Sequence, residues 1–448
     1  MVALIKNKLR PPHPDNLKDS QFGILAFETA KTMSRLISLY KSLSDPQIST
    51  LTNHLLTSKG LAFLNSSDHH FLLTLAWAER LEDLDSAAAA VARIAKRCND
   101  FALSRFDVFY RDLKLGFLRF RKLHYGSKAA DKKIRKMEKL VETTSSLHSA
   151  LETLTEMEIS ERKLNQWKKT TTRPTETVQN ESILLFYQKL QNQRRQVRHF
   201  REISLWSKSF DKIVDMMARI VCVVYSRISM VSGHGRKLSI SEPVRENLVP
   251  HSGPIMPTSK RTIVRFYSRR VDEPRAVAAP ATNKVFHSAG ECTVGGSGLA
   301  LRYANVILLA EEYLNSTAAI SHDDRESLYQ MLPENLKTVV GAKLSRNMRH
   351  AGAGADLSLA EGWRDAMVEM MTWLAPVARD TVAWQMERNV EKMKMGARTS
   401  ESDNGNEKPS VLLVQTLHFA DKEKTEAAIA EVLVGLSCIF RFENRRPI

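Results

Sequence analysis

The stretch from Lys128 to Lys169 most constrains the fold, because it contains neither proline nor glycine. Nothing in it therefore breaks an α-helix. A narrow apolar stripe runs along it at three- and four-residue intervals, formed by Ile134, Met137, Val141, Thr144, Leu147, Leu151 and Leu154. This spacing predicts one long helix with a coiled-coil-like seam.

A second long segment, from Glu181 to Met230, follows the polar break TTTRPTETVQN and has the same kind of apolar periodicity. We expect one helix over this segment, folded back on the first as an antiparallel hairpin spanning residues 127–231. Neither helix is apolar on all sides, so the outer face of the hairpin is predicted to be solvated or to bind a partner.

Helical periodicity also fills residues 21–126, which we predict to form an N-terminal helical domain after a flexible N-terminus, residues 1–20. A first helix runs from Phe22 to Tyr40. A second follows the N-cap candidates at 65–68, with a buried face formed by Phe71, Leu72, Leu75, Leu81, Leu84, Val91 and Ile94. The third, at 101–125, mixes aromatic and basic residues. Its aromatics could stack on nucleic-acid bases, but their helical spacing favours core packing.

Residues 232–294 change to a proline-, glycine- and serine-rich composition without a sustained period, which predicts a disordered linker. Helical periodicity returns in a C-terminal domain, residues 295–396, where we expect Pro376 to kink or end the helix that begins near Asp356. A flexible loop at 397–409 and a final helical segment at 410–448, broken around Asp421, complete the chain. The predicted fold class is all-α, with helical bundle regions, the long hairpin and the linker.

Several classes of protein are disfavoured by the sequence. The four cysteines lie far apart without a CxxC pair, which fits a reducing compartment. No apolar run approaches the roughly 18 residues that cross a bilayer, and the first residues lack the apolar stretch of a secretory signal. Val2 stands where N-myristoylation needs glycine. We therefore expect a protein that neither spans a membrane nor is secreted.

The positive charge is concentrated in one part of the chain. The whole sequence carries a formal charge of +16, and residues 93–139 hold 15 basic against 5 acidic residues. The densest cluster is Lys132, Lys133, Arg135 and Lys136. We predict that these four residues contact an acidic partner or act as a nuclear import signal, with anionic lipid and a merely solvated helix face as alternatives.

The motifs that most resemble catalytic or ligand sites have simpler explanations. The glycines of TVGGSGLALRYAN match neither GxGxxG nor the Walker pattern, so we interpret them as a tight turn into a helix. His69 and His70 are adjacent, and adjacent helical residues point about 100° apart, which is unsuitable for sharing a metal. We find no nucleophile, base and orienting group in a recognisable pattern, and predict no enzyme activity, no cofactor, no metal and no small-molecule substrate.

Two sets of blocks resemble a known plant family. The first is GILAFETAKTMSRLISLYKSLSD with SSDHHFLLTLAWAERLEDL, and the second is GGSGLALRYANVILLAEEYL, DDRESLYQMLPENLK, WLAPVARDTVAWQMERN and LLVQTLHFADKEKTEAAIAEVLVGL. They are similar to the paired N- and C-terminal domains of unknown function of the phytosulfokine-simulator family.

This resemblance implies a non-enzymatic, helical regulator of plant growth that acts as a binding or scaffold protein in peptide-hormone signalling. It implies protein partners, not nucleic acid, and carries over no site residues. We expect a location in the nucleus or cytoplasm. The alternative is a peripheral adaptor at the cytoplasmic face of the plasma membrane, bound to anionic lipid through a basic helix.

Overall fold

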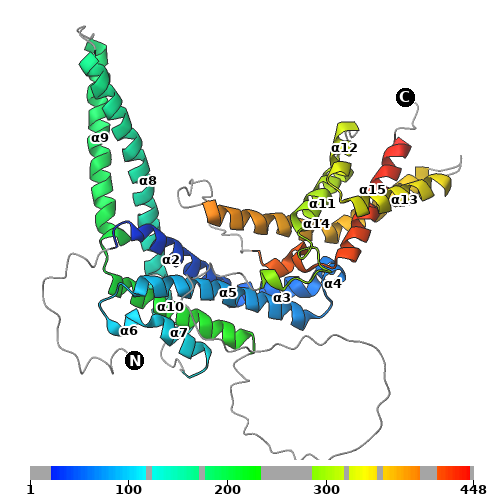
Figure 1. Ribbon diagram of the computed structural model, residues 1–448, viewed down its shortest axis with the longest axis horizontal. Coiled ribbons are helices and arrows are strands. Elements are labelled where there is room, and N and C mark those ends of the chain that lie inside the picture. Colours follow the sequence, from blue (N-terminus) through cyan, green and yellow to red (C-terminus); the bar gives the residue numbers. More distant parts are fainter. Residues whose placement is uncertain are drawn as a thin grey trace, which may run out of the picture.

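The computed structural model describes residues 22–117, 124–170, 177–233, 285–316, 322–350, 357–393 and 411–443. Within these ranges the chain forms fourteen α-helices and several 3-10 turns and no strand; Thr293 and Asp421 form an isolated bridge. The predicted all-α class is therefore confirmed (Figure 1).

The helices fall into three groups along the chain. Before the long hairpin lie α2 (Leu25–Ser42), α3 (Asp45–Thr57), α4 (Lys59–Leu64), α5 (His69–Ala95), α6 (Phe101–Ser104) and α7 (Phe106–Lys114). The hairpin and the helix after it are α8 (Lys128–Thr170), α9 (Thr177–Ile203), η2 (Leu205–Ser207) and α10 (Phe210–Val231). The last group comprises η4 (Phe286–Ser288), α11 (Ala300–Asn315), α12 (His322–Gln330), α13 (Glu334–His350), α14 (Leu357–Met393), η5 (Leu413–Gln415), η6 (Leu417–Phe419) and α15 (Lys422–Glu443).

A first hydrophobic core joins α2, α5, α7, α10 and the beginning of α8. Helix α10 lies at its centre, since twelve of its residues are buried. From α8 the buried residues Ile134, Met137 and Leu140 enter the same core. Ile134 and Met137 belong to the apolar stripe predicted from the sequence, and their burial fixes which face of α8 points to solvent.

A second core joins helices that are far apart in sequence. Leu55, Leu61 and Leu64 of α3 and α4 pack with Tyr303 of α11, Met371 of α14 and residues of α13 and α15. The predicted N- and C-terminal domains therefore share this core. The division into domains at residues 126 and 295 stays a prediction, but the hydrophobic cores do not follow it.

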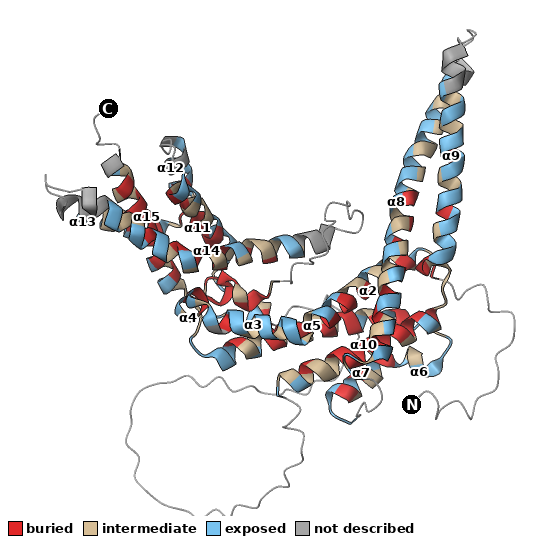
Figure 2. Cartoon of the chain, turned by 180° about the vertical axis from the view of Figure 1, so that it is seen from behind, coloured by how far each residue is buried: buried red, intermediate tan, exposed pale blue. Residues whose placement is uncertain are grey.

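Helix α5 belongs to both cores. Leu72 and Ala76 in its first half are buried in the second core, whereas Leu84 and Val91 in its second half are buried in the first. In Figures 1 and 2 the helix runs from one group of helices to the other. The two cores are thus joined by a continuous helix of 27 residues.

Midway along α5, two carboxylates bind segments from the end of the chain. Glu79 accepts hydrogen bonds from Trp384 Nε1 (3.3 Å) and from the Leu413 backbone N–H (2.7 Å). Glu82 accepts one from the Val285 N–H (2.8 Å). We call this junction the seam. Its apolar part consists of Val285, Trp384, Leu413 and Phe419, with Phe286 stacked on both Trp384 and His418.

Several predicted helix boundaries are confirmed and others are wrong. Asp68 is the N-cap of α5 and accepts hydrogen bonds from the backbone N–H groups of His70 (2.9 Å) and Phe71 (3.2 Å). Phe71 itself was predicted to be buried and is exposed. The predicted third helix is two helices, α6 and α7, separated at Arg105.

The aromatics of this third segment divide in the same way. Phe106 and Tyr110 are buried, as core packing requires, but Phe117 is 77% exposed. Phe120 lies outside the described residues. The expectation of an aromatic core face therefore holds for the first part of the segment and is wrong at Phe117.

The long hairpin is confirmed for α8 and α9, which run antiparallel (Figure 1). The expected single helix from 181 to 230 is wrong, because α9 ends at Ile203 and α10 begins at Phe210. The Ser204 side chain accepts a hydrogen bond from the Trp206 N–H (3.3 Å), which caps a 3-10 turn between the helices. This break turns α10 away from the hairpin and into the first core.

Near the end of the chain, helix α14 continues through Pro376 and is not ended by it. The segment from Val411 forms the 3-10 turns η5 and η6, where a helix was expected, and α15 follows Asp421 as predicted. The predicted linker extends too far, because Val285 and Val294 are buried. Its part at 234–284, the N-terminus at 1–20 and the loop at 397–409 lie outside the described residues.

Candidate functional site: a basic surface on α8 and α10

The four predicted site residues lie together on the first turns of α8. Lys132, Arg135 and Lys136 are exposed, and Lys133 is half-buried. They point outward because the intervening Ile134 and the following Met137 are buried in the first core. The amphipathic spacing of α8 therefore places the basic side chains on one surface.

Helix α10 adds a fifth basic residue, Arg219. Burial lowers the pKa of Lys133, and the positive charges of Arg219 and Lys136 lower it further, while Asp215 opposes them. Arg219 Nε lies 2.9 Å from each oxygen of Asp215 on the same helix. We call Lys132, Lys133, Arg135, Lys136 and Arg219 the basic surface. Sequence reasoning missed Arg219, because only the packing of α10 against α8 brings it here.

Two acidic residues of α8 beside this cluster are bound to α2. Asp131 accepts a hydrogen bond from Tyr40 Oη (2.7 Å), and Glu138 lies 3.1 Å from Lys41 Nζ. Both carboxylates are thus engaged on the side of α8 that faces α2. Asp215 offsets the charge of Arg219, so the positive charge of the basic surface comes mainly from the four residues of α8. A positive surface attracts acidic groups over about a Debye length, about 8–10 Å at physiological salt.

The glycine cluster before α11 serves close packing. A Cβ at Gly295 would lie 2.3 Å from His418 Nδ1, and one at Gly296 would lie 2.1 Å from the Gly290 carbonyl oxygen. The Gly295 N–H donates to the His418 carbonyl (2.9 Å) and the Gly296 N–H donates to Thr293 Oγ1 (3.0 Å). Both N–H groups therefore have partners within the chain, which supports the interpretation as a tight turn over anion binding.

The histidine pair and the cysteines show no ligand or nucleophile arrangement. His69 and His70 are exposed at the start of α5. In the described ranges, no group of three or more His, Cys, Asp or Glu side chains could hold a metal ion. Burial raises the pKa of both Cys98 and Cys222 to about 12, so these thiols stay protonated at neutral pH.

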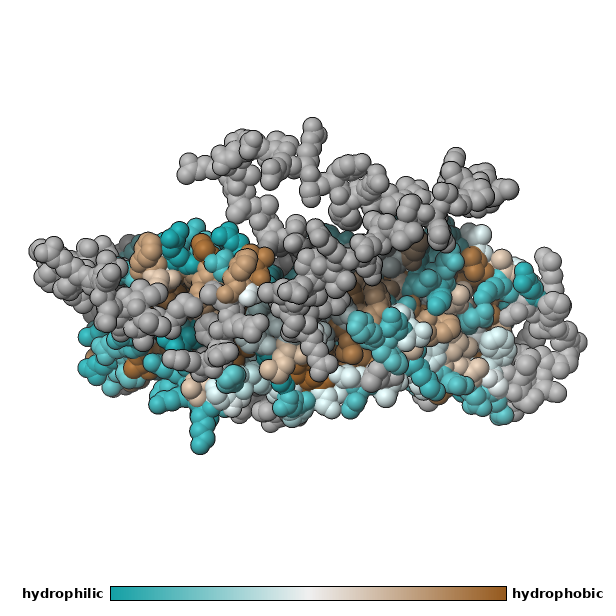
Figure 3. Space-filling model, turned by 90° about the horizontal axis from the view of Figure 1, so that it is seen from below, coloured by the Kyte–Doolittle hydropathy of each residue, from teal (hydrophilic) through white to brown (hydrophobic). Residues whose placement is uncertain are grey.

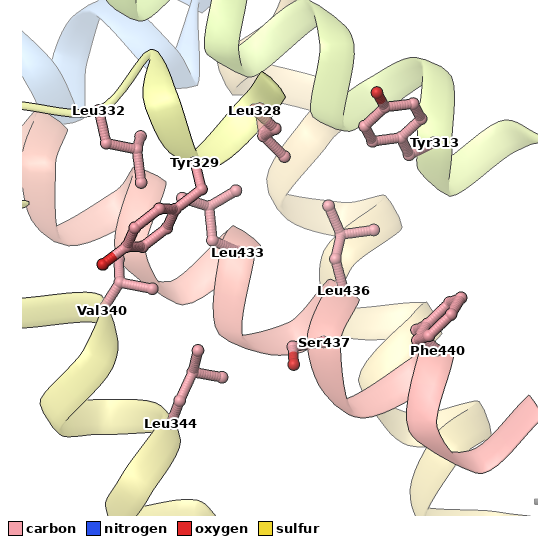
Figure 4. Close-up of a pocket in the computed structure, with 10 residues that line it drawn as sticks. All are labelled: Tyr313, Leu328, Tyr329, Leu332, Val340, Leu344, Leu433, Leu436, Ser437 and Phe440. Atoms are coloured by element: carbon pink, nitrogen blue, oxygen red, sulfur yellow. The ribbon is translucent and has the colours of Figure 1, made fainter. Parts of the chain in front are cut away.

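A cavity of about 180 Å³ opens between α11, α12, α13 and α15 (Figure 4). It is lined by Tyr313, Leu328, Tyr329, Leu332, Val340, Leu344, Leu433, Leu436, Ser437 and Phe440. No histidine or carboxylate is among these lining residues, so Ser437 has no base beside it there. The cavity is an apolar gap between helices, and its only titratable lining side chains are Tyr313 and Tyr329.

On the face seen from below, hydrophobic residues lie in separate patches among hydrophilic ones (Figure 3). Across the helices that the structure describes, none has a stretch both long and apolar enough to cross a bilayer. The basic surface is therefore the candidate site with the clearest chemistry.

Comparison with known proteins relates the chain to one family of plant proteins. Residues 24–80 match the model of a domain of unknown function, DUF3475, and residues 293–383 match that of a second one, DUF668. PSK SIMULATOR 1 of Arabidopsis thaliana is 26% identical over 430 residues, which is 94% of this chain. The chain is a relative of the PSK SIMULATOR proteins. The resemblance predicted from the quoted blocks is thereby confirmed.

PSK SIMULATOR 3 and PSK SIMULATOR 2 of the same plant are each 24% identical, again over 94% of this chain. The chain spans 56–60% of the length of these three relatives. No solved structure matches it significantly. The basic surface lies outside both matched domain ranges, so the domain matches say nothing about its role.

Proposed function

We propose that this protein is a non-enzymatic regulator of plant growth that acts as a binding or scaffold protein in phytosulfokine-related signalling. The names of the three relatives support the signalling context. The observation that carries the binding role is the basic surface, which places five cationic side chains on two packed helices. A partner with an acidic surface fits it.

The packing of α8 and α10 into the first core favours binding. The opposite side of α8 is buried through Ile134, Met137 and Leu140, and α10 is largely buried. Cationic groups on a fixed framework lose less conformational freedom when they bind than groups on a loose segment do. The far end of the α8–α9 hairpin and the helices α11 to α15 extend away from α2 and α10 in different directions (Figure 1), which suits a scaffold that brings partners together.

Two features that could have formed a catalytic site, the glycine cluster and the apolar cavity, support a non-enzymatic role. The glycine cluster packs against His418, and the apolar cavity contains no acid–base pair among its lining residues. Both matched domains are described as being of unknown function. Binding by charge and shape is the activity that the described residues favour.

We propose that the protein acts in the nucleus or cytoplasm, with the basic surface serving import or contact with an acidic protein. The test is imaging of a fluorescent fusion in plant cells. The wild type is compared with a variant in which Lys132, Lys133, Arg135 and Lys136 are changed to glutamine. We expect nuclear signal in the wild type and its loss in the variant.

A matched control changes four other exposed basic residues of the same region to glutamine, namely Lys96, Arg97, Arg105 and Arg111. This control removes the same charge and should leave the distribution unchanged. If both variants lose nuclear signal equally, overall charge and not the basic surface determines the location, and the proposal is wrong.

The alternative, a peripheral adaptor on anionic lipid, predicts a different outcome. Basic residues near a membrane surface contribute about 1 kcal/mol each, and this attraction falls with salt. Signal at the cell edge that the four-residue variant releases would favour this alternative. Flotation with phosphatidylserine vesicles but not with phosphatidylcholine vesicles, lost at high salt, would confirm it.

A further inference from the structure

The α8–α9 hairpin continues well beyond the body of the protein (Figures 1 and 2). Its base is packed, because Leu147, Ala150 and Val197 are buried in a cluster that includes Phe27 and Trp206. We call residues 151–170 and 177–198 the arm. At 1.5 Å per residue, each helix of the arm is about 30 Å long.

Inside the arm, polar contacts set the register of the two helices. Tyr187 Oη donates to Asn165 Oδ1 (3.0 Å), and Arg194 lies 2.9 Å from Glu161 and 3.5 Å from Glu158. On the outside, Ile159 is 46% exposed and Leu184 is 70% exposed. An arm that keeps large apolar side chains in water has a surface suited to another helix.

Of the four large apolar side chains that the structure describes as exposed on the arm, Ile159 and Leu184 lie on one side of the hairpin, and Trp167 and Leu185 lie outside that side. At 100° per residue, Glu152 and Ile159 share one flank of α8, and Leu184 and Arg195 share one flank of α9. Glu158 and Arg194 face each other across the hairpin. Ile159 and Arg195 each follow one of them by 100° around the helix, and an equal turn on two antiparallel helices leads to the same side. Arg198, about 60° from Arg195 around α9, borders the same side. We call these five residues the arm face.

The two halves of the arm face are complementary in charge. Its α8 half carries the exposed Glu152, with the exposed Glu156 beside it, and its α9 half carries the exposed Arg195 and Arg198. In both helices the charged residues lie nearer the base and the apolar residues nearer the tip. The contacts of Tyr187 with Asn165 and of Gln193 with the Ala150 carbonyl (2.9 Å) together place Glu152 level with residues 191–200 of α9, a stretch that includes Arg195.

We propose that the arm face binds the arm face of a second copy of this chain. A two-fold axis parallel to the arms puts α8 of one protomer against α9 of its partner, and the reverse. Glu152 of each protomer then meets Arg195 and Arg198 of its partner, while Ile159 approaches Leu184 across the interface. The product is a closed four-helix bundle, the ordinary way in which two helical hairpins bury exposed apolar residues.

This proposal is independent of the basic surface and is tested by molar mass. Sedimentation equilibrium of the full chain should give a dimer, twice the 50.7 kDa of one chain. Changing Ile159→Glu and Leu184→Glu should give a monomer. A matched control, Leu115→Glu, changes a leucine that is 55% exposed on the body, and this variant should remain dimeric.

A charge swap tests the pairing itself. Arg195→Glu with Arg198→Glu should weaken dimerisation about tenfold or more, because like charges then face each other. Adding Glu152→Lys and Glu156→Lys should restore it, which a merely damaged helix would not show. Circular dichroism verifies that every variant stays helical. A wild type that remains at 50.7 kDa, a dimer that survives the arm changes, or a swap that fails to restore pairing would each overturn the proposal.

Discussion

The carboxylate of Glu79 should make the stability of the seam depend on pH. Burial raises its pKa from 4.5 to about 7, and the charge of Asp83 raises it as well, whereas the hydrogen bonds from Leu413 and Trp384 lower it. The folded protein therefore binds a proton that the unfolded chain releases between these two values. Stability from this group is complete below pH 4.5 and is lost as the pH rises through about 7.

The magnitude follows from the shift. At 1.36 kcal/mol per pKa unit, raising the pKa from 4.5 to about 7 corresponds to about 3 kcal/mol of folding free energy lost above pH 7. Glu79→Gln removes the buried charge, but its single amide oxygen can accept from only one of the two N–H groups, those of Trp384 and Leu413, and its NH2 group faces the other. This costs about 1–3 kcal/mol at every pH. The stability of the variant relative to the wild type should therefore rise by about 2–3 kcal/mol between pH 5 and pH 8.

The measurement is urea unfolding of both proteins between pH 5 and pH 8, followed by tryptophan fluorescence, since Trp384 lies in the seam. Comparing the two at each pH cancels the contribution of His418, whose pKa is lowered by burial. Glu138→Gln, a change at the surface ion pair with Lys41, is the control and should alter stability by less than about 1 kcal/mol throughout. Parallel pH profiles for wild type and Glu79→Gln would refute the reasoning.

Three further substitutions test the packing. Gly295→Ala should destabilise the fold by about 1–3 kcal/mol in a denaturant titration, because its Cβ would meet His418 at 2.3 Å. Thr144→Val removes the buried hydroxyl that accepts from the Leu205 N–H (3.2 Å), and thermal unfolding should show a loss of about 1–3 kcal/mol. Leu147→Ala leaves a cavity at the base of the arm; it should cost about 2–5 kcal/mol and speed hydrogen exchange in α8 and α9 beyond it.

The elements that the sequence predicts well are those with a strong local signal. Helix α8 was expected at 128–169 and is observed at Lys128–Thr170, because its apolar stripe has no competing breaker. The N-cap of α5 was also expected, since Asp68 precedes an apolar run and a carboxylate accepts hydrogen bonds from the first free N–H groups. Such features depend on neighbours within a few residues.

The break between α9 and α10 is marked in the sequence by two serines, but the apolar periodicity that continues across them led to a different prediction. The apolar period continues through Leu205, so the segment was interpreted as one helix. Ser204 and Ser209 stand on either side of the 3-10 turn, and Ser204 caps it. Helices α3 and α4 likewise had signals, with Pro46 near the start of α3 and Ser58 as the N-cap of α4.

The candidate site shows the same division. The four basic residues of α8 could be placed on one surface, because the positions of Ile134 and Met137 on the stripe fix the outward face. Arg219 could not, since it lies more than eighty residues further along the chain and reaches Lys133 only through the packing of α10. Contacts between distant helices are set by the whole core, and one sequence carries no local mark of them.

Helix α5 links the two matched domains. The DUF3475 match ends at residue 80 and the DUF668 match ends at residue 383, next to Glu79 and Trp384, which are hydrogen-bonded to each other. Cutting the chain after residue 80 would remove Leu84 and Val91 from the first core, and it would separate Leu72 from its C-terminal partners in the second core. The second core takes residues from both matched domains, and the first core takes residues that follow the DUF3475 match. The two domains therefore stabilise each other and form parts of one fold.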